Sequence, residues 1–212
     1  MRLAERMLRQ WYQPALTPLT AVFLPLSWLF GGIVFARRVL YRRGWLKKIN
    51  FPVPLIVVGN LTVGGTGKTP VVIWLAERLR EQGYRPGIVT RGVGRRKTQG
   101  VLQALPDSDP YAVGDEAVVL ARRTHCPVRV CVDRVRAAAA LLAETDCNII
   151  LSDDGLQHYR LGRTFEMVLA DAARGRGNGF LLPAGPLREP VRRFSEVDAV
   201  CVKGGGFHSQ WV

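Results

Sequence analysis

The residues best suited to chemistry form a glycine-rich octet, Thr62-Val63-Gly64-Gly65-Thr66-Gly67-Lys68-Thr69. Glycine has no Cβ, so backbone N–H groups in such a loop can turn toward one bound anion. The Lys68 ammonium can reach outer phosphates, and the Thr69 hydroxyl can hold a magnesium ion. The octet follows the G-x-x-x-x-G-K-[ST] pattern except at its first position, where Thr62 replaces glycine.

The segments that flank the octet indicate how it is presented. Before it, Leu55–Val58 is an apolar run with the composition and length of a strand. After it, apolar residues recur at helical spacing, at Val72, Leu75, Ala76 and Leu79. A chance glycine-rich turn is the alternative, but a strand, a glycine loop and a helix in this order favour phosphate binding.

Carboxylates follow one predicted strand and open one predicted helix. Asp153 and Asp154 come after the buried-strand run Cys147–Leu151, and Gln157 and His158 lie just beyond. Adjacent aspartates repel each other, so a bound magnesium ion would stabilise the pair. The alternative is a turn in which the aspartates cap the next element. Asp115, in Gly-Asp-Glu, is either a site acid or an ordinary partner of a helix dipole.

Strands and helices alternate after residue 50. We expect strands at 55–58, 86–90, 101–105, 127–132, 147–151, 165–170 and 198–202, and helices after the octet, at 117–123 and at 133–144, with Asp133 as N-cap. This alternation predicts an α/β fold of the P-loop NTPase type, a parallel sheet with helices on both faces. Ligands bind at the carboxyl ends of such strands. The octet, Arg91, Asp115, Asp153, Asp154 and Asp171 all fall at such ends.

Positive charge is concentrated at the N-terminus. The 212 residues carry a formal net charge of +13. The first 50 residues hold nine Lys and Arg against one acid, which places +8 of that charge there. Leu16–Ala36 has no charged residue over 21 positions, about the length that crosses a bilayer core. Basic charge beside an apolar run indicates an anionic membrane surface rather than nucleic acid.

The sequence leaves three structures open for Leu16–Ala36. It can be a spanning helix, with all that follows in the cytoplasm because Arg37–Lys48 carries six positive charges. It can be a kinked helix in the interface, with Trp28 and Trp45 at headgroup level, or a buried helix of a soluble domain. We expect membrane attachment, and a division into a membrane-associated segment (1–50) and a P-loop domain (51–212).

Other residue types exclude some classes of site. The four cysteines form no C-x-x-C pair, so we expect buried, reduced thiols, and the three histidines lack metal-ligand spacing. The cluster Arg95–Lys97 is either a solvated loop or an electropositive rim for an anionic substrate. The long stretch Ala173–Pro190 has an apolar interior, so we expect an organised, functional loop rather than disorder.

The ordered motifs GNLTVGGTGKTP, TRG, GDE, SDDGLQH and NGFLLPAGPLREP resemble the tetraacyldisaccharide 4'-kinase (lipid A 4'-kinase) family of Gram-negative bacteria. The resemblance runs from the N-terminal segment to about Val202. It implies transfer of the ATP γ-phosphate to the 4'-hydroxyl of a tetraacylated glucosamine disaccharide 1-phosphate, with ATP and Mg²⁺ as cofactors. It further implies a location on the cytoplasmic face of the inner membrane, with the lipid A precursor and membrane lipid as partners and no nucleic acid.

The resemblance also implies residue roles. Asp115 would be the base, or base partner, for the sugar hydroxyl, and Lys68 and His158 would join it in catalysis. Asp153 and Asp154 would serve magnesium and the phosphates with Thr69. Substrate-binding roles fall on Arg91, Gln157, Asp171 and Asn178. The threonine at the first position of the octet is the family's own form.

Two departures from the family pattern stand out. Val93 replaces a tyrosine that usually follows Thr/Ser-Arg-Gly. The family continues for roughly another hundred residues, a small second lobe that carries a histidine acting with the GDE aspartate. We therefore expect a C-terminally truncated copy. The rival functions are a membrane-associated P-loop NTPase and a truncated chain that binds nucleotide without chemistry.

Overall fold

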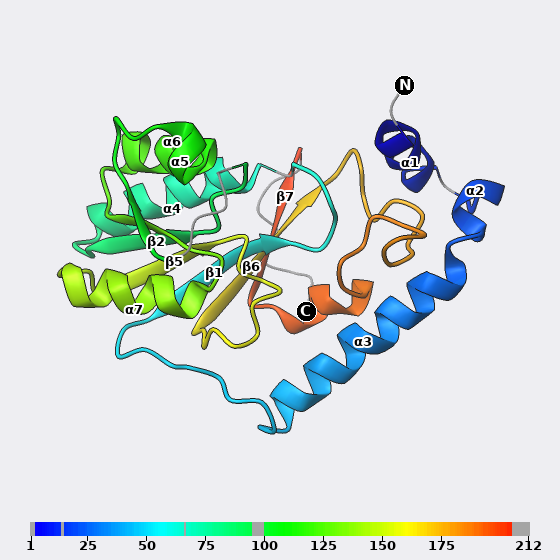
Figure 1. Cartoon of the computed structure of the whole chain (residues 1–212), viewed down its shortest axis with the longest axis horizontal. Helices are drawn as coiled ribbons and strands as arrows, with labels where there is room; N and C mark the ends of the chain where they lie inside the picture. The colour runs from blue at the N-terminus through cyan, green and yellow to red at the C-terminus, as the bar shows by residue number, and fades with distance from the viewer. Residues whose placement is uncertain (1–2, 14, 66, 95–99, 205–212) are drawn as a thin grey trace. The chain divides into compact units, whose positions relative to one another are not determined.

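The computed structural model describes residues 3–13, 15–65, 67–94 and 100–204. Its helices are α1 (Leu3–Trp11), α2 (Pro18–Ala21), α3 (Leu24–Arg42), α4 (Lys68–Glu81), α5 (Pro110–Val113), α6 (Asp115–Thr124) and α7 (Arg134–Glu144), with a 3-10 helix η1 (Val191–Glu196) (Figure 1). Its strands are β1 (Leu55–Asn60), β2 (Pro86–Thr90), β3 (Leu102–Ala104), β4 (Val128–Val130), β5 (Ile149–Asp153), β6 (Phe165–Asp171) and β7 (Ala199–Lys203). The predicted cluster Arg95–Lys97 lies outside the described residues.

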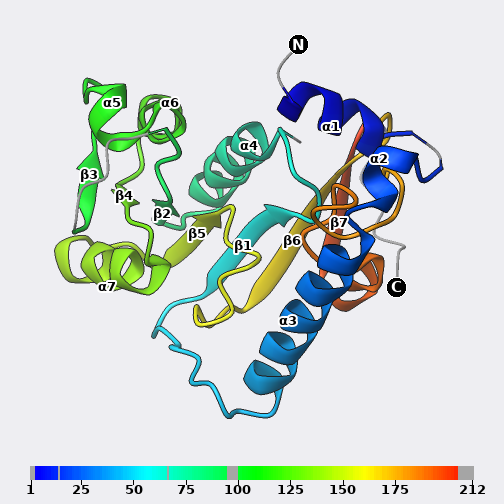
Figure 2. The same ribbon diagram turned by 45° about the vertical axis from the view of Figure 1, so that its right-hand side comes forward.

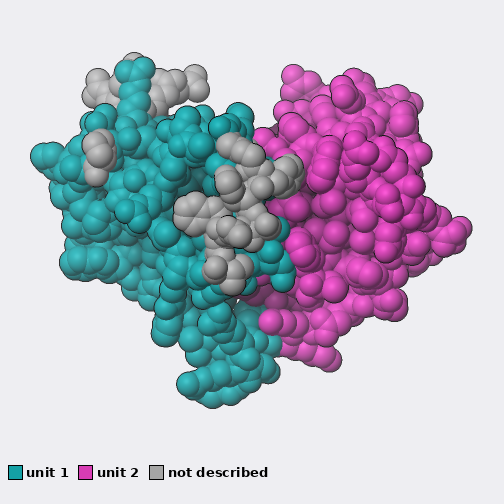
Figure 3. Space-filling model, turned by 180° about the vertical axis from the view of Figure 1, so that it is seen from behind, with its two compact units in different colours: residues 1–46, 60–66, 168–212 teal, residues 47–59, 67–167 magenta. Residues whose placement is uncertain are grey.

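The chain divides into two compact units, coloured separately in Figure 3. Unit 1 comprises residues 1–46, 60–66 and 168–212, and unit 2 comprises residues 47–59 and 67–167. The octet is shared between them, with residues 62–65 described in unit 1 and 67–69 in unit 2. The division at residue 50 into a membrane-associated segment and a P-loop domain stays a prediction.

The strands form a mostly parallel sheet in the order β3-β4-β2-β5-β1-β6-β7. In unit 2, β5 pairs in parallel with β1 and β2, and β2 pairs in parallel with β4. All five residues of β2 and all five of β5 are buried, as expected for strands covered on both faces. β3 runs antiparallel to β4, which the sequence did not predict.

Helices cover both faces of the sheet in unit 2, as predicted. Figure 1 shows α4, α5 and α6 on one face and α7 on the other. Val72 and Ala76 of α4 are fully buried, and α7 packs on β2 and β4. The contact between α7 and β2 depends on a small residue, because a Cβ at Gly87 would lie 2.6 Å from Leu141 Cδ2. The core of this unit therefore lies between the central strands and these helices.

Local signals set the ends of the unit 2 helices. Asp133 caps α7 as predicted, since its Oδ1 accepts hydrogen bonds from the N–H groups of Val135 and Arg136. The helix α4 stops before Gly83, which has a φ of +83° and whose N–H donates to the Arg80 carbonyl. The Asp133 cap thus fixes where α7 begins, and Gly83 fixes where α4 ends.

The apolar segment Leu16–Ala36 does not form one helix. α2 ends at Ala21, and α3 begins at Leu24 and continues past the apolar segment to Arg42. In the described part of the chain, no helix is both long enough and apolar enough to cross a bilayer.

One face of α3 packs within unit 1, where α3 runs beside η1 (Figure 2). The Ser27 hydroxyl donates to the Leu181 carbonyl at 2.8 Å, and the buried Arg38 forms an ion pair with Glu196. Another face is open: the side chains of Leu26, Leu29 and Ile33 are each more than half exposed. Their i, i+3, i+7 spacing places these three residues on one stripe of the helix.

Candidate functional site

Lys68 and two aspartates meet at the carboxyl edge of the unit 2 sheet. Lys68 begins α4, and its Nζ lies 3.5 Å from Asp154 Oδ1. Asp153 is the last residue of β5 and is 1% exposed. Its Oδ2 accepts a hydrogen bond from the hydroxyl of Thr90, the last residue of β2, at 3.4 Å. The structure therefore brings the predicted lysine and aspartates close together.

Asp153 is held in an environment that disfavours its charged form. Burial raises the pKa of Asp153 to about 6, and the neighbouring carboxylates of Glu116 and Asp154 act in the same direction. Lys68 and Arg134 oppose this shift in the pKa. Its Oδ1 has no hydrogen-bond partner among the described residues. A buried, unpartnered carboxylate oxygen beside a second aspartate is a position where a cation would be stabilised.

Arg134 also belongs to this cluster, although it is part of no sequence motif. It begins α7 and is 1% exposed. Its guanidinium donates to the backbone carbonyls of Cys131 at 2.7 Å and Asp153 at 3.1 Å. Burial lowers the pKa of Arg134 to about 10, against the charges of Asp153 and Asp154. Arg134 thus adds positive charge close to the two aspartates, and its hydrogen bond to the Asp153 carbonyl fixes the end of β5.

The GDE motif lies at the start of α6 and contributes to the same cluster. Asp115 is exposed at the first position of this helix, and its Oδ1 accepts a hydrogen bond from the Glu116 N–H. Burial raises the pKa of Glu116, while the charge of Lys68 lowers it and those of Asp115 and Asp154 raise it. Glu116 therefore interacts electrostatically with Lys68 and Asp154. The motif alone indicates only Asp115 as a site residue.

Glycines bring the TRG and GDE motifs into contact. Gly114 has a φ of +96°, and a Cβ there would lie 2.8 Å from Gly92 Cα, so a larger residue would separate the two segments. Arg91, one residue before Gly92, is exposed, and its charge lowers the pKa of Arg134. The structure thus brings Arg91 and the GDE segment to the Lys68 cluster, defined here as Lys68, Glu116, Arg134, Asp153 and Asp154.

Gln157 and His158 lie in a tight turn after β5. The turn closes because the His158 N–H donates to the Gly155 carbonyl at 2.9 Å. Gly155 has no room for a side chain, since a Cβ would lie 2.3 Å from Ser152 Oγ. Both Gln157 and His158 are half-buried, four and five residues beyond Asp153. Arg163 holds the turn by donating to the His158 carbonyl.

The first part of the octet is described within unit 1. Thr62 forms an isolated antiparallel bridge with Leu187, and the Val63 N–H donates to the Pro186 carbonyl at 2.8 Å. Residues 186–187 of the long loop therefore hold the chain where it leaves β1. Thr66 lies outside the described residues.

Asp171 and Asn178, also in unit 1, hydrogen-bond to nearby backbone. Asp171 Oδ1 accepts from the N–H groups of Ala173 and Arg174. The Asn178 amide donates to the Ala184 carbonyl at 2.9 Å, and its oxygen accepts from the Phe180 N–H. The expected organisation of the loop 173–190 is confirmed by these contacts, which order its backbone.

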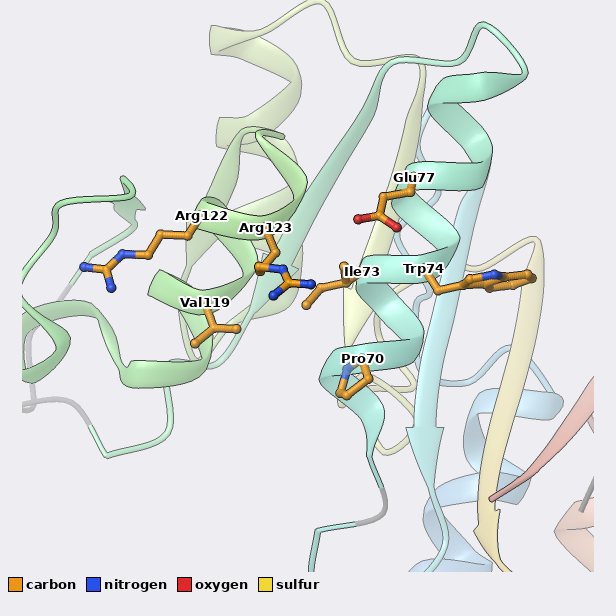
Figure 4. A pocket seen from close by; sticks show the side chains of 7 residues that line it. All are labelled: Pro70, Ile73, Trp74, Glu77, Val119, Arg122 and Arg123. Carbon is orange, nitrogen blue, oxygen red and sulfur yellow. The ribbon is translucent and has the colours of Figure 1, made fainter. Parts of the chain in front are cut away.

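Unit 2 has a groove beside α4 and α6. It is lined by Pro70, Ile73, Trp74, Glu77, Val119, Arg122 and Arg123 (Figure 4). Arg123 points toward Ile73 of α4, whereas Arg122 points away from α4 and donates to the Pro106 carbonyl. None of the predicted site residues lines it, so the presence of a groove does not identify the chemistry.

Magnesium fits the donor set of the Lys68 cluster. The described residues contain no group of three or more His, Cys, Asp or Glu side chains that could hold a metal alone. Magnesium needs no such group, because it is usually held by one or two carboxylates, waters and substrate phosphates. The unpartnered Oδ1 of Asp153 and the adjacent Asp154 supply hard oxygen donors of the required type.

Comparison with known proteins places these features in one family. Residues 19–211 match the family model of tetraacyldisaccharide-1-P 4'-kinase, LpxK. A crystal structure of LpxK from Aquifex aeolicus in complex with ATP superposes with a TM-score of 0.79 at 35% identity, over 87% of this chain and 59% of that chain.

Curated relatives carry the same name. Tetraacyldisaccharide 4'-kinase from Nitrosococcus oceani is 54% identical over 93% of this chain and 58% of its own length. The protein of that name from Thiobacillus denitrificans is 53% identical over 89% of this chain and 58% of its own length. The chain thus spans somewhat more than half the length of these relatives.

Proposed function

The chain belongs to the tetraacyldisaccharide-1-P 4'-kinase family, and we propose that the protein transfers the γ-phosphate of ATP to the 4'-hydroxyl of a tetraacylated glucosamine disaccharide 1-phosphate. The observation that carries this proposal is the Lys68 cluster. It joins the lysine of a phosphate-binding loop to carboxylates at the ends of neighbouring strands. That combination supports phosphoryl transfer, which needs positioning and charge neutralisation more than covalent chemistry by the protein.

The octet binds the nucleotide. Its backbone N–H groups, the start of α4 and the Lys68 ammonium bind and orient the ATP phosphates. The ion pair with Asp154 at 3.5 Å supports this role, because the carboxylate helps to position the Lys68 ammonium. Thr62 to Thr69 then act as the ATP-binding residues.

Asp153, Asp154 and the Thr69 hydroxyl would hold a magnesium ion. When bound, the ion would supply charge neutralisation to the phosphates. The raised pKa and unpartnered Oδ1 of Asp153 support this role, because a divalent cation offsets the cost of its buried charge. Arg134 holds the Asp153 backbone through its hydrogen bond to the carbonyl.

Asp115 takes the proton of the sugar hydroxyl, directly or with a partner. Its exposed position at the start of α6 supports access to an acceptor. Glu116, whose pKa is raised by burial, is a second acid at this place. In unit 2, His158, Gln157 and Arg91 line the acceptor side. In unit 1, Asp171 and Asn178 remain predicted substrate-binding residues.

The protein acts at the cytoplasmic face of the inner membrane, with α3 in the interface. The exposed stripe of Leu26, Leu29 and Ile33 supports this placement, together with the exposed Trp28. Arg37 continues the stripe, and exposed basic residues follow it at Arg42, Arg43, Lys47 and Lys48. Their charge favours an anionic lipid surface, where the lipid acceptor resides.

Transfer of label from γ-labelled ATP tests the function. The purified chain is incubated with the disaccharide 1-phosphate lipid in mixed micelles, and labelled lipid and free phosphate are measured side by side. Labelled lipid is the expected result. Free phosphate without labelled lipid would contradict the kinase and indicate an NTPase. Bound nucleotide with neither product would contradict activity of this chain and indicate a nucleotide-binding form without chemistry.

A further inference from the structure

Three successive carbonyls of the octet each accept a hydrogen bond from a side chain in unit 1. The Tyr12 hydroxyl donates to the Val63 carbonyl at 3.3 Å. The Asn60 amide donates to the Gly64 carbonyl at 3.2 Å. The Arg174 guanidinium donates to the Gly65 carbonyl at 3.4 Å. The donors come from the N-terminal segment, the end of β1 and the loop after β6, so distant parts of the chain converge on one stretch of backbone.

This arrangement has a consequence for the N–H groups of the loop. Within one trans peptide, the carbonyl and the N–H point in opposite directions. A Val63 carbonyl held by Tyr12 therefore turns the Gly64 N–H away from Tyr12. Neither the Gly64 nor the Gly65 N–H donates to another backbone group in the described part of the chain. Adjacent N–H groups that stay unpaired while their carbonyls are held form an anion-binding nest.

The outer two donors are themselves fixed. Arg174 lies over the Tyr12 ring, with 5.8 Å between the guanidinium carbon and the ring centroid. Asp171 holds the turn that presents Arg174, because its Oδ1 accepts the Arg174 N–H. On the N-terminal side, the Trp11 indole N–H donates to the Pro183 carbonyl at 3.0 Å, and the Trp11 carbonyl accepts from the Asn178 N–H at 2.8 Å.

Arg174 also limits the space around Gly64. Gly64 has a φ of +115°, and a Cβ there would lie 3.2 Å from Arg174 Nη1. A side chain at this position would strain the backbone and push the guanidinium away. The contact with Arg174 therefore adds a second reason for glycine at position 64, besides access for a phosphate.

We propose that Tyr12, Asn60 and Arg174 form a carbonyl clamp, a set of positioning residues that holds the glycine loop ready for a nucleotide phosphate. The clamp removes part of the ordering cost that the loop would otherwise meet on binding. It also makes nucleotide affinity depend on Tyr12, which precedes the family match at residues 19–211. The inference rests on the proposed function only in taking the anion to be a nucleotide phosphate.

Titration calorimetry with ATP tests the clamp in the full chain. Tyr12→Phe removes only the hydroxyl donor, and Arg174→Gln removes the charge and the long reach of the guanidinium. Each change is expected to raise the ATP dissociation constant about threefold to tenfold, the worth of one hydrogen bond. The double variant is expected to bind more weakly than either single variant, and Arg174→Lys to recover part of the affinity.

Two matched variants control for general effects. Arg176→Gln removes an exposed arginine from the same turn, and Tyr111→Phe removes a hydroxyl from an exposed tyrosine of unit 2. Both are expected to bind ATP like the parent chain. In steady-state assays, clamp variants are expected to raise the KM for ATP more than they lower kcat, because the defect lies in nucleotide binding.

The outcomes separate the clamp from the overall function. ATP affinity unchanged in both Tyr12→Phe and Arg174→Gln would overturn the clamp. The clamp would also be overturned if the variants lose thermal stability without nucleotide and this loss accounts for the whole loss of ATP affinity. That result would indicate that Tyr12 and Arg174 stabilise the fold rather than position the loop. If the clamp variants bind ATP weakly as expected and no variant phosphorylates lipid, the clamp stands and the lipid kinase function fails.

Discussion

At the scale of single residues, the Lys68 cluster combines a lysine that we propose binds phosphate with three acids that repel one another. The sequence predicts Lys68, Asp153 and Asp154 because each follows a strand or a glycine loop with a recognisable pattern. Glu116 and Arg134 are different. Glu116 is an acid at a helix start, where a role in the dipole suffices, and Arg134 is a common charged residue that belongs to no motif. Only packing turns them inward, and no spacing rule reports that.

Replacing Asp115 separates catalysis from nucleotide binding. Asp115→Asn keeps the size of the side chain but removes the base, so turnover is expected to fall about a hundredfold or more. The ATP dissociation constant is expected to stay close to that of the parent. Calorimetry and lipid phosphorylation assays on the same preparation measure both. Equal loss of binding and turnover would refute the assignment.

Asp153 links stability to pH. Its folded pKa of about 6 exceeds the ordinary value of 3.8, so the fold favours the protonated form. The stability that protonation provides is complete below pH 4 and is lost as the pH rises through 6. The cost of the charge at pH 7 is of the order of 3 kcal/mol.

Asp153→Asn should therefore stabilise the nucleotide-free protein at pH 7 and leave it nearly unchanged at pH 4. Chemical denaturation at the two pH values measures the difference. The same substitution is expected to weaken magnesium-dependent nucleotide binding, because a carboxylate is lost. A variant that is less stable than the parent at pH 7 would show that Asp153 serves the fold rather than the ligand.

At the scale of elements, the sequence predicts the strands of unit 2 well because apolar runs and glycine or aspartate boundaries agree. β2 covers the predicted residues 86–90, and α7 begins after Asp133 as expected. The antiparallel direction of β3 was not predictable, because a short edge strand carries no signal of direction. The break before α3 does have a signal, since Pro25 sits in its first turn, where proline is favoured.

The N-cap of α7 gives a test at this scale. Asp133→Ala removes the acceptor for two helix N–H groups and the partner of Arg160, so unfolding is expected to need about 1 kcal/mol less. Denaturant titration measures the change. Asp146→Ala, at an exposed aspartate just after the helix, is the control and should change stability little. Equal effects of the two changes would argue against the cap.

At the scale of the whole molecule, exposed basic side chains and exposed apolar side chains occur together in the N-terminal segment. The motif order identifies the family, because several independent motifs must agree. The surface of α3 could not be predicted in the same way, since an uncharged run is compatible with a spanning, an interfacial or a buried helix. The exposed stripe of Leu26, Leu29 and Ile33 can be identified only from the structure, because the structure shows that Ser27 and Arg38 contact the rest of unit 1.

Vesicle sedimentation tests this surface. The triple change Leu26→Ser, Leu29→Ser and Ile33→Ser is expected to reduce binding to anionic vesicles about tenfold or more, because three apolar side chains no longer leave water. Leu105→Ser with Val132→Ser, at exposed apolar positions of unit 2, is the control. Equal binding by the triple variant and the parent would contradict the interfacial placement of α3.

The most direct measurement of the central claim is the position of the new phosphate on the lipid. Phosphorus NMR of the product formed from ATP and the disaccharide 1-phosphate lipid is expected to show a second phosphomonoester, coupled to the proton on carbon 4'. The signal should be nearly absent with Asp115→Asn. A phosphate at another position, or unchanged lipid while free phosphate accumulates, would contradict a 4'-kinase built on the Lys68 cluster.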